Sequence, residues 1–104
     1  MPIPLILLIL GAIAAITITV VVVAILYWND IKNWFQSRNY LKQSDKDNIA
    51  FTIQEKLSSG NYKTVQGIFN QRTNDIKDGR VIESKDIDSG VRNAHRNDQV
   101  VIYE

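Results

Sequence analysis

Residues 5–26 form a stretch of 22 residues without a charged side chain, and no other feature constrains the fold as strongly. At a rise of about 1.5 Å per residue, a helix of this length would cross the roughly 30 Å hydrocarbon core of a bilayer. All 12 Lys and Arg residues and all 11 Asp and Glu residues come later in the chain. The sequence therefore predicts a single N-terminal transmembrane α-helix within residues 1–28, followed by a polar part.

Other interpretations of this stretch remain open. The β-branched run at residues 16–23 would favour a strand in water, but an unpaired segment in lipid satisfies its backbone only as a helix. A cleavable signal peptide is disfavoured because no Lys or Arg precedes Lys32 and the apolar core is too long. A buried helix of a globular domain is disfavoured because little chain remains to enclose it.

Several residues have expected roles in a membrane helix. Gly11, Ala15 and Thr19 would share one helix face, a spacing that permits close packing of two helices and self-association. Aromatic residues typical of interface anchors follow the apolar stretch: Tyr27, Trp28, Trp34 and Phe35. Residues 29–43 are expected to form a juxtamembrane amphipathic helix or a solvated linker.

The charges after the apolar stretch predict its orientation. The basic residues nearest to its end are Lys32, Arg38, Lys42 and Lys46. The positive-inside rule then places the N-terminus outside and residues 44–104 in the cytoplasm, in a plasma (inner) or thylakoid-type membrane. The chain has no Cys, which excludes disulfides and thiol chemistry and fits a reducing compartment.

Residues 44–104 predict a small α+β domain with the order helix, strand, strand, helix, strand. Ser44 resembles a helix N-cap, and Ile49, Ile53 and Leu57 recur at helical spacing, so an amphipathic helix ending at Gly60 is expected. Two antiparallel strands are expected near residues 62–69 and 76–83. Gly67 suggests a bulge or a close crossing, and the dipeptide at 78–79 offers a competing hairpin turn. A short helix beginning at 84 or 86 and a final strand at 100–103 complete a three-stranded sheet.

The chain carries no recognisable motif for nucleotide binding, zinc proteolysis or EF-hand calcium binding. His95 is the only histidine, and its expected place in the last turn of a helix favours a structural role over general-base catalysis. Four acidic residues, considered as a cation site, are interleaved with basic ones: Asp75, Asp78, Asp86 and Asp88. Four basic residues, considered as a phosphate-binding patch, are likewise interleaved with acids: Arg72, Arg80, Arg92 and Arg96. We therefore predict no catalytic residue, cofactor or metal, and the nearly neutral charge argues against a nucleic-acid partner.

Residues 65–70, 79–80, 95–96 and 100–104 together resemble a C-terminal module of small bacterial membrane-anchored proteins, including cyanobacterial ones, for which no activity is established. The resemblance implies a bacterial source and a compact module, and it carries over no site residue.

The leading functional hypothesis is a non-catalytic, single-span membrane adaptor or accessory subunit of a membrane-associated assembly. Its partners would be the lipid bilayer and other membrane or membrane-associated subunits. The candidate partner surface, where an edge strand would accept a partner's strand, consists of Gly67, Phe69, Arg80, His95 and Tyr103. The alternatives are a small membrane-active toxin whose helix oligomerises, and an enzyme or ligand binder using Arg80 and His95.

Overall fold

The computed structural model describes residues 5–14, 19–96 and 98–103. The described helices are α1 (Leu5–Ala14), α2 (Trp28–Ser37), α3 (Asn39–Ser44) and α4 (Ser89–Ala94). The described strands are β1 (Thr19–Leu26), β2 (Asn48–Lys56), β3 (Tyr62–Asn70), β4 (Asp75–Ile87) and β5 (Val100–Tyr103).

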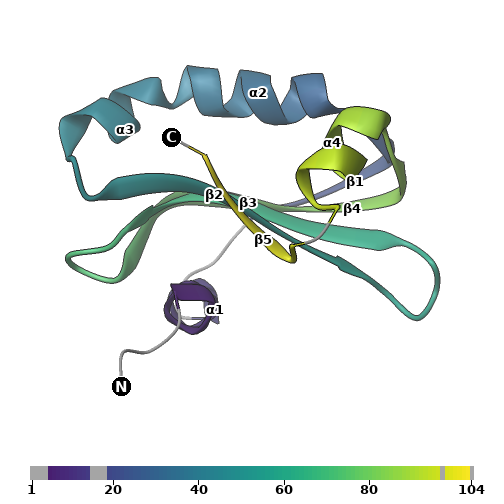
Figure 1. The fold of residues 1–104 in the computed structure, drawn as a ribbon, viewed down its shortest axis with the longest axis horizontal. Helices are drawn as coiled ribbons and strands as arrows, with labels where there is room; N and C mark the ends of the chain where they lie inside the picture. The colour runs from purple at the N-terminus through teal and green to yellow at the C-terminus, as the bar shows by residue number, and fades with distance from the viewer. Residues whose placement is uncertain (1–4, 15–18, 97, 104) are drawn as a thin grey trace.

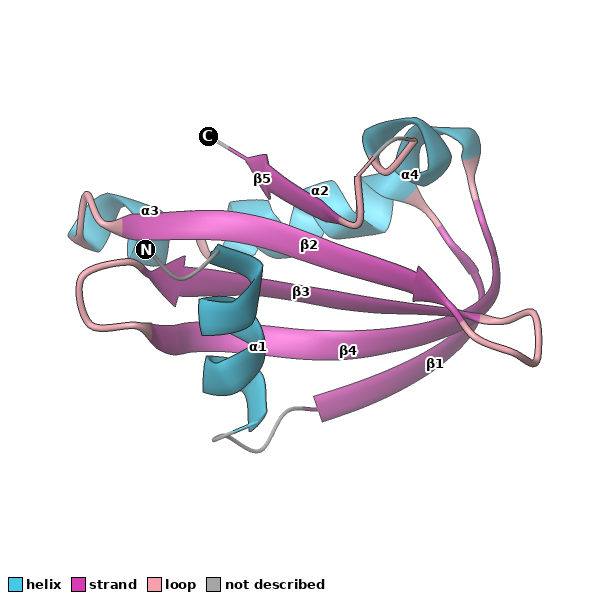
Figure 2. Cartoon of the chain, turned by 60° about the horizontal axis from the view of Figure 1, so that its bottom comes forward, coloured by secondary structure: helices cyan, strands magenta, loops and turns pink. Residues whose placement is uncertain are grey.

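The five strands form one mixed sheet in the order β1-β4-β3-β2-β5. β1 runs parallel to β4, and the other neighbouring strands are antiparallel. Helices α2, α3 and α4 lie on one face of the sheet, and α1 lies on the opposite face (Figure 1). β1 and β5 therefore form the two edges of the described sheet, as Figure 2 shows.

The predicted transmembrane helix is wrong, and with it the predicted single-pass membrane localisation. Within the described residues, no helix is long and apolar enough to cross a membrane. α1 has only 10 residues, which at the helical rise extend over about 15 Å, or half a bilayer core. Gly11 lies in α1 and Thr19 in β1, so they do not share a helix face. Ala15, the third residue of the expected packing motif, lies outside the described residues.

Residues 19–26, at the end of the apolar stretch, form strand β1 because a partner strand is available. β1 pairs with β4 from Thr19 opposite Arg80 to Leu26 opposite Ile87. β-branched residues prefer the extended backbone, and β4 satisfies the hydrogen bonds that lipid could not. Residues 19–23 of the β-branched run therefore take the extended conformation that they prefer because β4 is available as a partner. The toxin hypothesis required an oligomerising membrane helix, and the described residues contain no helix that could span a membrane.

The expected interface aromatics belong largely to the packing of α2 on the sheet. Ile31 and Trp34 are buried on the face of α2 that meets the strands. Phe35 packs beside Trp34 with their ring centroids 5.6 Å apart. Trp28 contacts α4 through Gly90, and only Tyr27 is well exposed. The 29–43 segment thus covers the sheet instead of lying along a bilayer.

The helix expected from Ser44 to Gly60 is also wrong, since residues 48–56 form β2. Ile49 and Ile53 are four residues apart, and this even spacing places them on one face of a strand as well as one face of a helix. Phe51 lies between them, fully buried in the same apolar cluster. Gly60 does adopt the left-handed conformation, with φ of 92°, but in the turn between β2 and β3.

The predicted antiparallel pairing of two strands after Gly60 is confirmed by β3 and β4. The chain turns at residues 71–74 and not at the 78–79 dipeptide, and the register shifts between Ile68 and Phe69. The close crossing expected at Gly67 is also present. A Cβ atom there would lie 2.8 Å from the carbonyl oxygen of Asp78 and 2.9 Å from the Phe51 ring. Only glycine fits this position without a shift of its neighbours.

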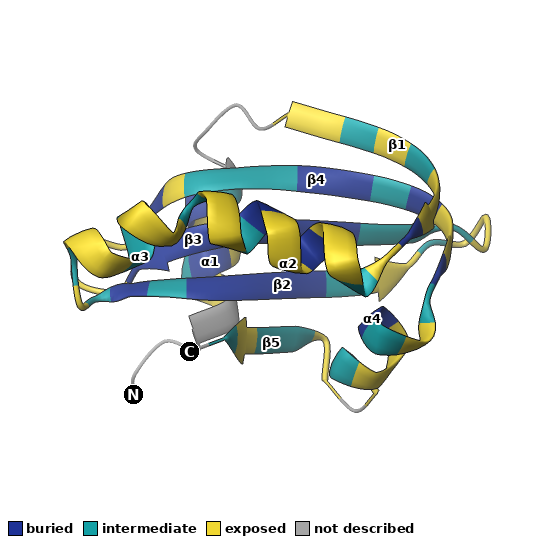
Figure 3. Ribbon diagram, turned by 90° about the horizontal axis from the view of Figure 1, so that it is seen from above, coloured by how far each residue is buried: buried dark blue, intermediate teal, exposed yellow. Residues whose placement is uncertain are grey.

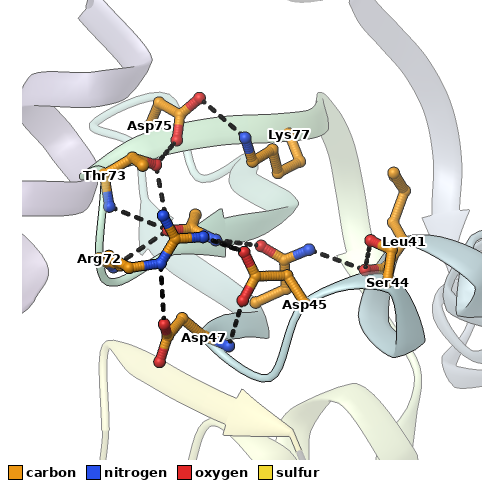
Figure 4. A network of polar contacts seen from close by, with 10 residues as sticks. Leu41, Ser44, Asp45, Asp47, Arg72, Thr73, Asp75 and Lys77 are labelled. Carbon is orange, nitrogen blue, oxygen red and sulfur yellow. Dashed lines mark hydrogen bonds and ion pairs between the residues drawn. The ribbon is translucent and has the colours of Figure 1, made fainter.

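A polar network fixes the turns at one end of the sheet (Figure 4). Asp45 Oδ1 accepts from the backbone N–H of Asp47, so the acidic residues after Ser44 close a turn instead of starting a helix. The guanidinium of Arg72 forms ion pairs with both carboxylates, Asp45 and Asp47. The buried Asn70 amide donates to Asn48 Oδ1 at 2.7 Å and accepts from the backbone N–H groups of Arg72 and Thr73. This network connects the start of β2 to the β3–β4 turn.

Candidate functional site

Helix α2 runs along the sheet and leaves a hollow on each side of its axis. The hollow toward β2 and β5, which we call the Tyr103 groove, has a volume of about 460 Å³. It is lined by Phe35, Gln36, Asn39, Lys42, Ala50, Ile68 and Tyr103. Ala50 and Ile68 form its floor on β2 and β3, and Tyr103 closes it on the side of β5. Figure 3 shows α2 and α3 lying above these strands, with β5 alongside β2.

Aromatic contacts fix the ring of Tyr103. Its centroid lies 5.2 Å from that of Phe35 and 5.7 Å from that of Trp28, both in tilted arrangements. Such offset geometries are favourable for aromatic pairs. Lys42 Nζ donates to the Tyr103 carbonyl at 3.1 Å, which ties α3 to the end of β5. The groove therefore has a rigid aromatic wall.

Behind this wall, three polar side chains form a hydrogen-bonded chain. Thr52 Oγ1 lies 2.7 Å from Tyr103 Oη and 2.7 Å from His95 Nε2, and His95 Nδ1 lies 3.0 Å from the Asp98 carbonyl oxygen. A carbonyl only accepts, so Nδ1 carries the proton and Nε2 of the neutral ring accepts from Thr52. Thr52 then accepts from the Tyr103 hydroxyl. Every hydroxyl hydrogen in the chain has an acceptor only while His95 is neutral.

Burial shifts the pKa values of both titratable groups in this chain, His95 and Tyr103. Desolvation lowers the pKa of His95, although bonds to backbone groups of Asp98 and Gln99 oppose the shift. Desolvation raises the pKa of Tyr103, opposed by its bond to Thr52. Both shifts favour the neutral forms, which are the forms that the hydrogen-bonded chain requires.

This arrangement lacks two features that nucleophilic catalysis needs. Thr52 is 0% exposed, so a substrate cannot reach its hydroxyl. His95 is oriented by a backbone carbonyl, whereas an orienting carboxylate would stabilise the imidazolium formed during proton transfer. Within residues 5–14, 19–96 and 98–103, no group of three acidic, His or Cys side chains could hold a metal ion.

The free edge of β5 borders the groove. β5 pairs with β2 from Ala50 opposite Tyr103 to Ile53 opposite Val100, and Gln54 N–H donates to the Gln99 carbonyl. Antiparallel ladders alternate, so this bond implies that Val101 and Tyr103 bond to β2 while the backbone groups of Val100 and Ile102 point outward. In the described part of the chain, no strand covers these outward groups.

The structure brings together only part of the candidate partner surface expected from the sequence. His95 and Tyr103 meet through Thr52, and Tyr103 lines the groove. Gly67 and Phe69 are buried in the central strand β3, and Phe69 is 0% exposed. Arg80 lies on the far side of α2, beside Trp34.

Sequence reasoning missed Thr52 because it assigned residues 48–56 to a helix. The alternation of Ala50 and Thr52 with larger apolar residues could have revealed a strand buried on both faces.

The acidic and basic clusters considered from the sequence are dispersed. Asp78 pairs with Arg38, Asp75 with Lys77, and Asp86 with Arg92. Arg72 belongs to the turn network, and Arg96 donates to Asn93. Neither set forms one site.

Comparison of the chain with protein-family models, curated proteins and solved structures finds no match.

Proposed function

We propose that this chain is a non-catalytic protein-interaction module that receives an extended segment of a partner along β5. One apolar side chain of the partner would enter the Tyr103 groove. The observation that carries this proposal is that Tyr103 is both a wall of the groove and a residue of an edge strand. Strand addition supplies main-chain hydrogen bonds, and a neighbouring pocket supplies selectivity for a side chain.

The lining of the groove supports an apolar occupant with a polar backbone. Phe35, Ala50, Ile68 and the Tyr103 ring present apolar surface. The side chains of Gln36 and Asn39 are exposed at its rim, where they can bond to the peptide groups of an entering segment. This combination of an apolar centre and a polar rim is typical of interaction sites, and it needs no catalytic group.

The proposal is tested by selecting random linear peptides, displayed on phage, against the immobilised full chain. Selected peptides are then synthesised with a fluorescent label, and binding is measured by anisotropy. We expect extended sequences with a recurring aromatic or large aliphatic residue. Absence of enrichment over an uncoated surface would contradict the proposal.

Two matched variants locate the binding surface. Gln36→Trp places a large ring at the rim of the groove, whereas Gln43→Trp makes the same change at an exposed position of α3 outside it. Gln36→Trp is expected to weaken binding at least about tenfold, which corresponds to about 1.4 kcal/mol, and Gln43→Trp to leave it unchanged. Equal binding by both variants would show that the peptide lies elsewhere.

Ile102→Pro tests the edge strand separately. Proline removes the N–H that the register directs outward, and it is tolerated at sheet edges. Binding of a selected peptide should weaken while the circular dichroism spectrum stays that of the parent chain. Unchanged affinity would exclude strand addition.

A further inference from the structure

A second hollow lies on the opposite side of α2, toward β1 and β4, and we call it the Arg80 cavity. Its volume is about 450 Å³. Val21, Val23 and Ile82 supply its apolar lining from the two strands, and Asn33, Arg38 and Arg80 supply polar groups. The cavity thus combines an apolar floor with two guanidinium groups.

Arg80 has no anionic partner in the part of the chain that the structure describes. Its Nε donates to the neutral amide oxygen Oε1 of Gln66 at 2.8 Å, and its Nη2 lies 3.4 Å from the backbone carbonyl of Asp30. Ion pairs within 4.0 Å are found for Arg38, Arg72 and Arg92, but not for Arg80. Asp30 also lines the cavity, and its carboxylate attracts Arg80 without forming an ion pair within 4.0 Å.

The positive charge of Arg80 lies where partial burial destabilises it unless an anion binds nearby. Arg80 is partly buried against Trp34, with its guanidinium carbon 5.6 Å from the ring centroid. Arg38 approaches the same ring at 4.0 Å, which places two cations on one indole. Desolvation, and then repulsion from Arg38, lowers the pKa of Arg80, and attraction to the Asp30 carboxylate opposes the shift. A half-buried cation without an ion pair is stabilised strongly by a bidentate anion such as a carboxylate.

Gln66 holds the guanidinium in place for such a ligand. Its amide is 0% exposed and donates to the Ile31 carbonyl at 2.9 Å, so its oxygen points at Arg80 Nε. Arg80 Nε donates to Gln66, and one N–H of Nη2 points at the Asp30 carbonyl. Nη1 of Arg80 has no acceptor among the described residues. The donor is therefore oriented in advance, which reduces the entropy lost on binding.

We infer that the Arg80 cavity binds a small organic acid, with its carboxylate on Arg80 and its aliphatic body against Val21, Val23 and Ile82. Charge complementarity selects the carboxylate, and the apolar strands select the body. Neither a bare inorganic anion nor a neutral amide satisfies both halves of the site.

The test uses ¹⁵N-labelled full-length chain titrated with sodium hexanoate, and the Arg80 Nε–H resonance and Trp34 indole resonance are followed. Hexanamide, which has the same apolar body without the charge, and inorganic phosphate, which has charge without the body, serve as matched probes. We expect saturable shifts with hexanoate and at least tenfold weaker effects with the other two. Equal effects of hexanoate and hexanamide, or no saturation with hexanoate, would overturn the inference.

A further arm separates the two sources of a carboxylate. N-acetylglutamate amide carries the acid on a peptide-like body, and it should bind more weakly than hexanoate. Tighter binding of the peptide-like acid would identify an acidic peptide segment and contradict a small aliphatic acid as the ligand.

Variants complete the test. Arg80→Gln should reduce hexanoate affinity at least tenfold, whereas Arg92→Gln, the same change on an exposed residue of α4, should leave it unchanged. Asn33→Asp is a second variant that should weaken hexanoate binding, because its new carboxylate would compete for Arg80. It does not disturb the core, since Asn33 is exposed. Undiminished binding in Asn33→Asp and Arg80→Gln would refute the site.

Discussion

The Nε2 atom of His95 lies 2.7 Å from the Oγ1 atom of Thr52, which is 43 residues away in the sequence. This contact joins α4 to the central part of β2, and through Tyr103 it reaches the wall of the groove. Protonation of Nε2 would reverse the bond, and Thr52 would then have to donate to Tyr103. The Tyr103 hydroxyl hydrogen would lose its acceptor.

His95 should therefore make the stability of the chain depend on pH near neutrality. Its pKa is lowered by folding, so the folded state binds this proton more weakly than the unfolded state. The stability contribution is fully present above the unfolded pKa of about 6.5 and is lost as pH falls below it. Urea unfolding at pH 7.5 and 5.5 should show lower stability at the acidic value. Asp45 and Asp75, whose pKa values are also lowered, titrate well below this window.

The matched variant for this prediction is His95→Gln, which can still bond to Thr52 but does not titrate. Its stability should change less between pH 7.5 and 5.5 than that of the parent chain. The same pH dependence in both proteins would show that another group is responsible.

Gly90→Ala should destabilise the chain, although alanine is the better helix former by about 1 kcal/mol. A Cβ atom at this position would lie 2.5 Å from Cβ and 2.8 Å from Cγ of Trp28. Overpacking of this kind costs about 1–3 kcal/mol, so a net loss of up to about 2 kcal/mol is expected. Chemical denaturation followed by tryptophan fluorescence measures the change. Ser89→Ala, at an exposed position of the same helix, should stay within about 0.5 kcal/mol of the parent.

Asn70→Ala should cost about 2–3 kcal/mol. The Asn70 side chain is fully buried and bonds to Asn48, to Asp45 and to two backbone N–H groups of the following turn. Its removal leaves the buried Asn48 side chain and the partly buried N–H groups of the turn without this partner, and unfolding in urea reports the loss. Asn74→Gly is the control, because Asn74 has φ of 58°, a conformation that glycine adopts freely. A near-neutral Asn70→Ala would mean that the network contributes little.

The edge strand β1 is expected to make the chain self-associate at high concentration. Val22 is 76% exposed on this edge, with Val20 and Ile25 also exposed, and the strand carries no charge. Val22→Lys should shift the onset of association to higher concentration, because lysine on an edge strand opposes pairing between molecules. Light scattering against concentration gives the measurement. Ser58→Lys adds the same charge in the exposed β2–β3 turn, and identical behaviour of the two variants would implicate net charge instead of the strand.

The sequence predicted the second half of the domain better than the first. The pairing of β3 with β4, the close crossing at Gly67 and a final strand at residues 100–103 could be derived from β-formers, turn residues and one glycine. These features depend on neighbouring residues in the chain, and local preferences describe them well.

The wrong secondary-structure predictions concern segments whose sequence pattern fits two different structures. Ile49 and Ile53 fit a helix or a strand, since a spacing of four is even. Ser44, expected as the N-cap of a helix, is instead the last residue of α3, where its hydroxyl donates to the Leu41 carbonyl, and Asp45 closes the turn that follows. In each case the choice depended on whether β3 and β5 were available to pair with β2.

The sequence by itself determined that residues 5–26 favour burial, because they carry no charge to hydrate, and that residues 16–23 favour extended backbone. Only the tertiary structure decided how this happens: part of the stretch packs as α1 under the sheet, and β4 supplies the hydrogen bonds that let β1 exist as a strand. The Tyr103 groove and the Arg80 cavity likewise depend on contacts between residues that are far apart in the sequence. Thr52 and Tyr103 meet because β2 and β5, which are far apart in the chain, are neighbours in the sheet, and His95 at the end of α4 joins them.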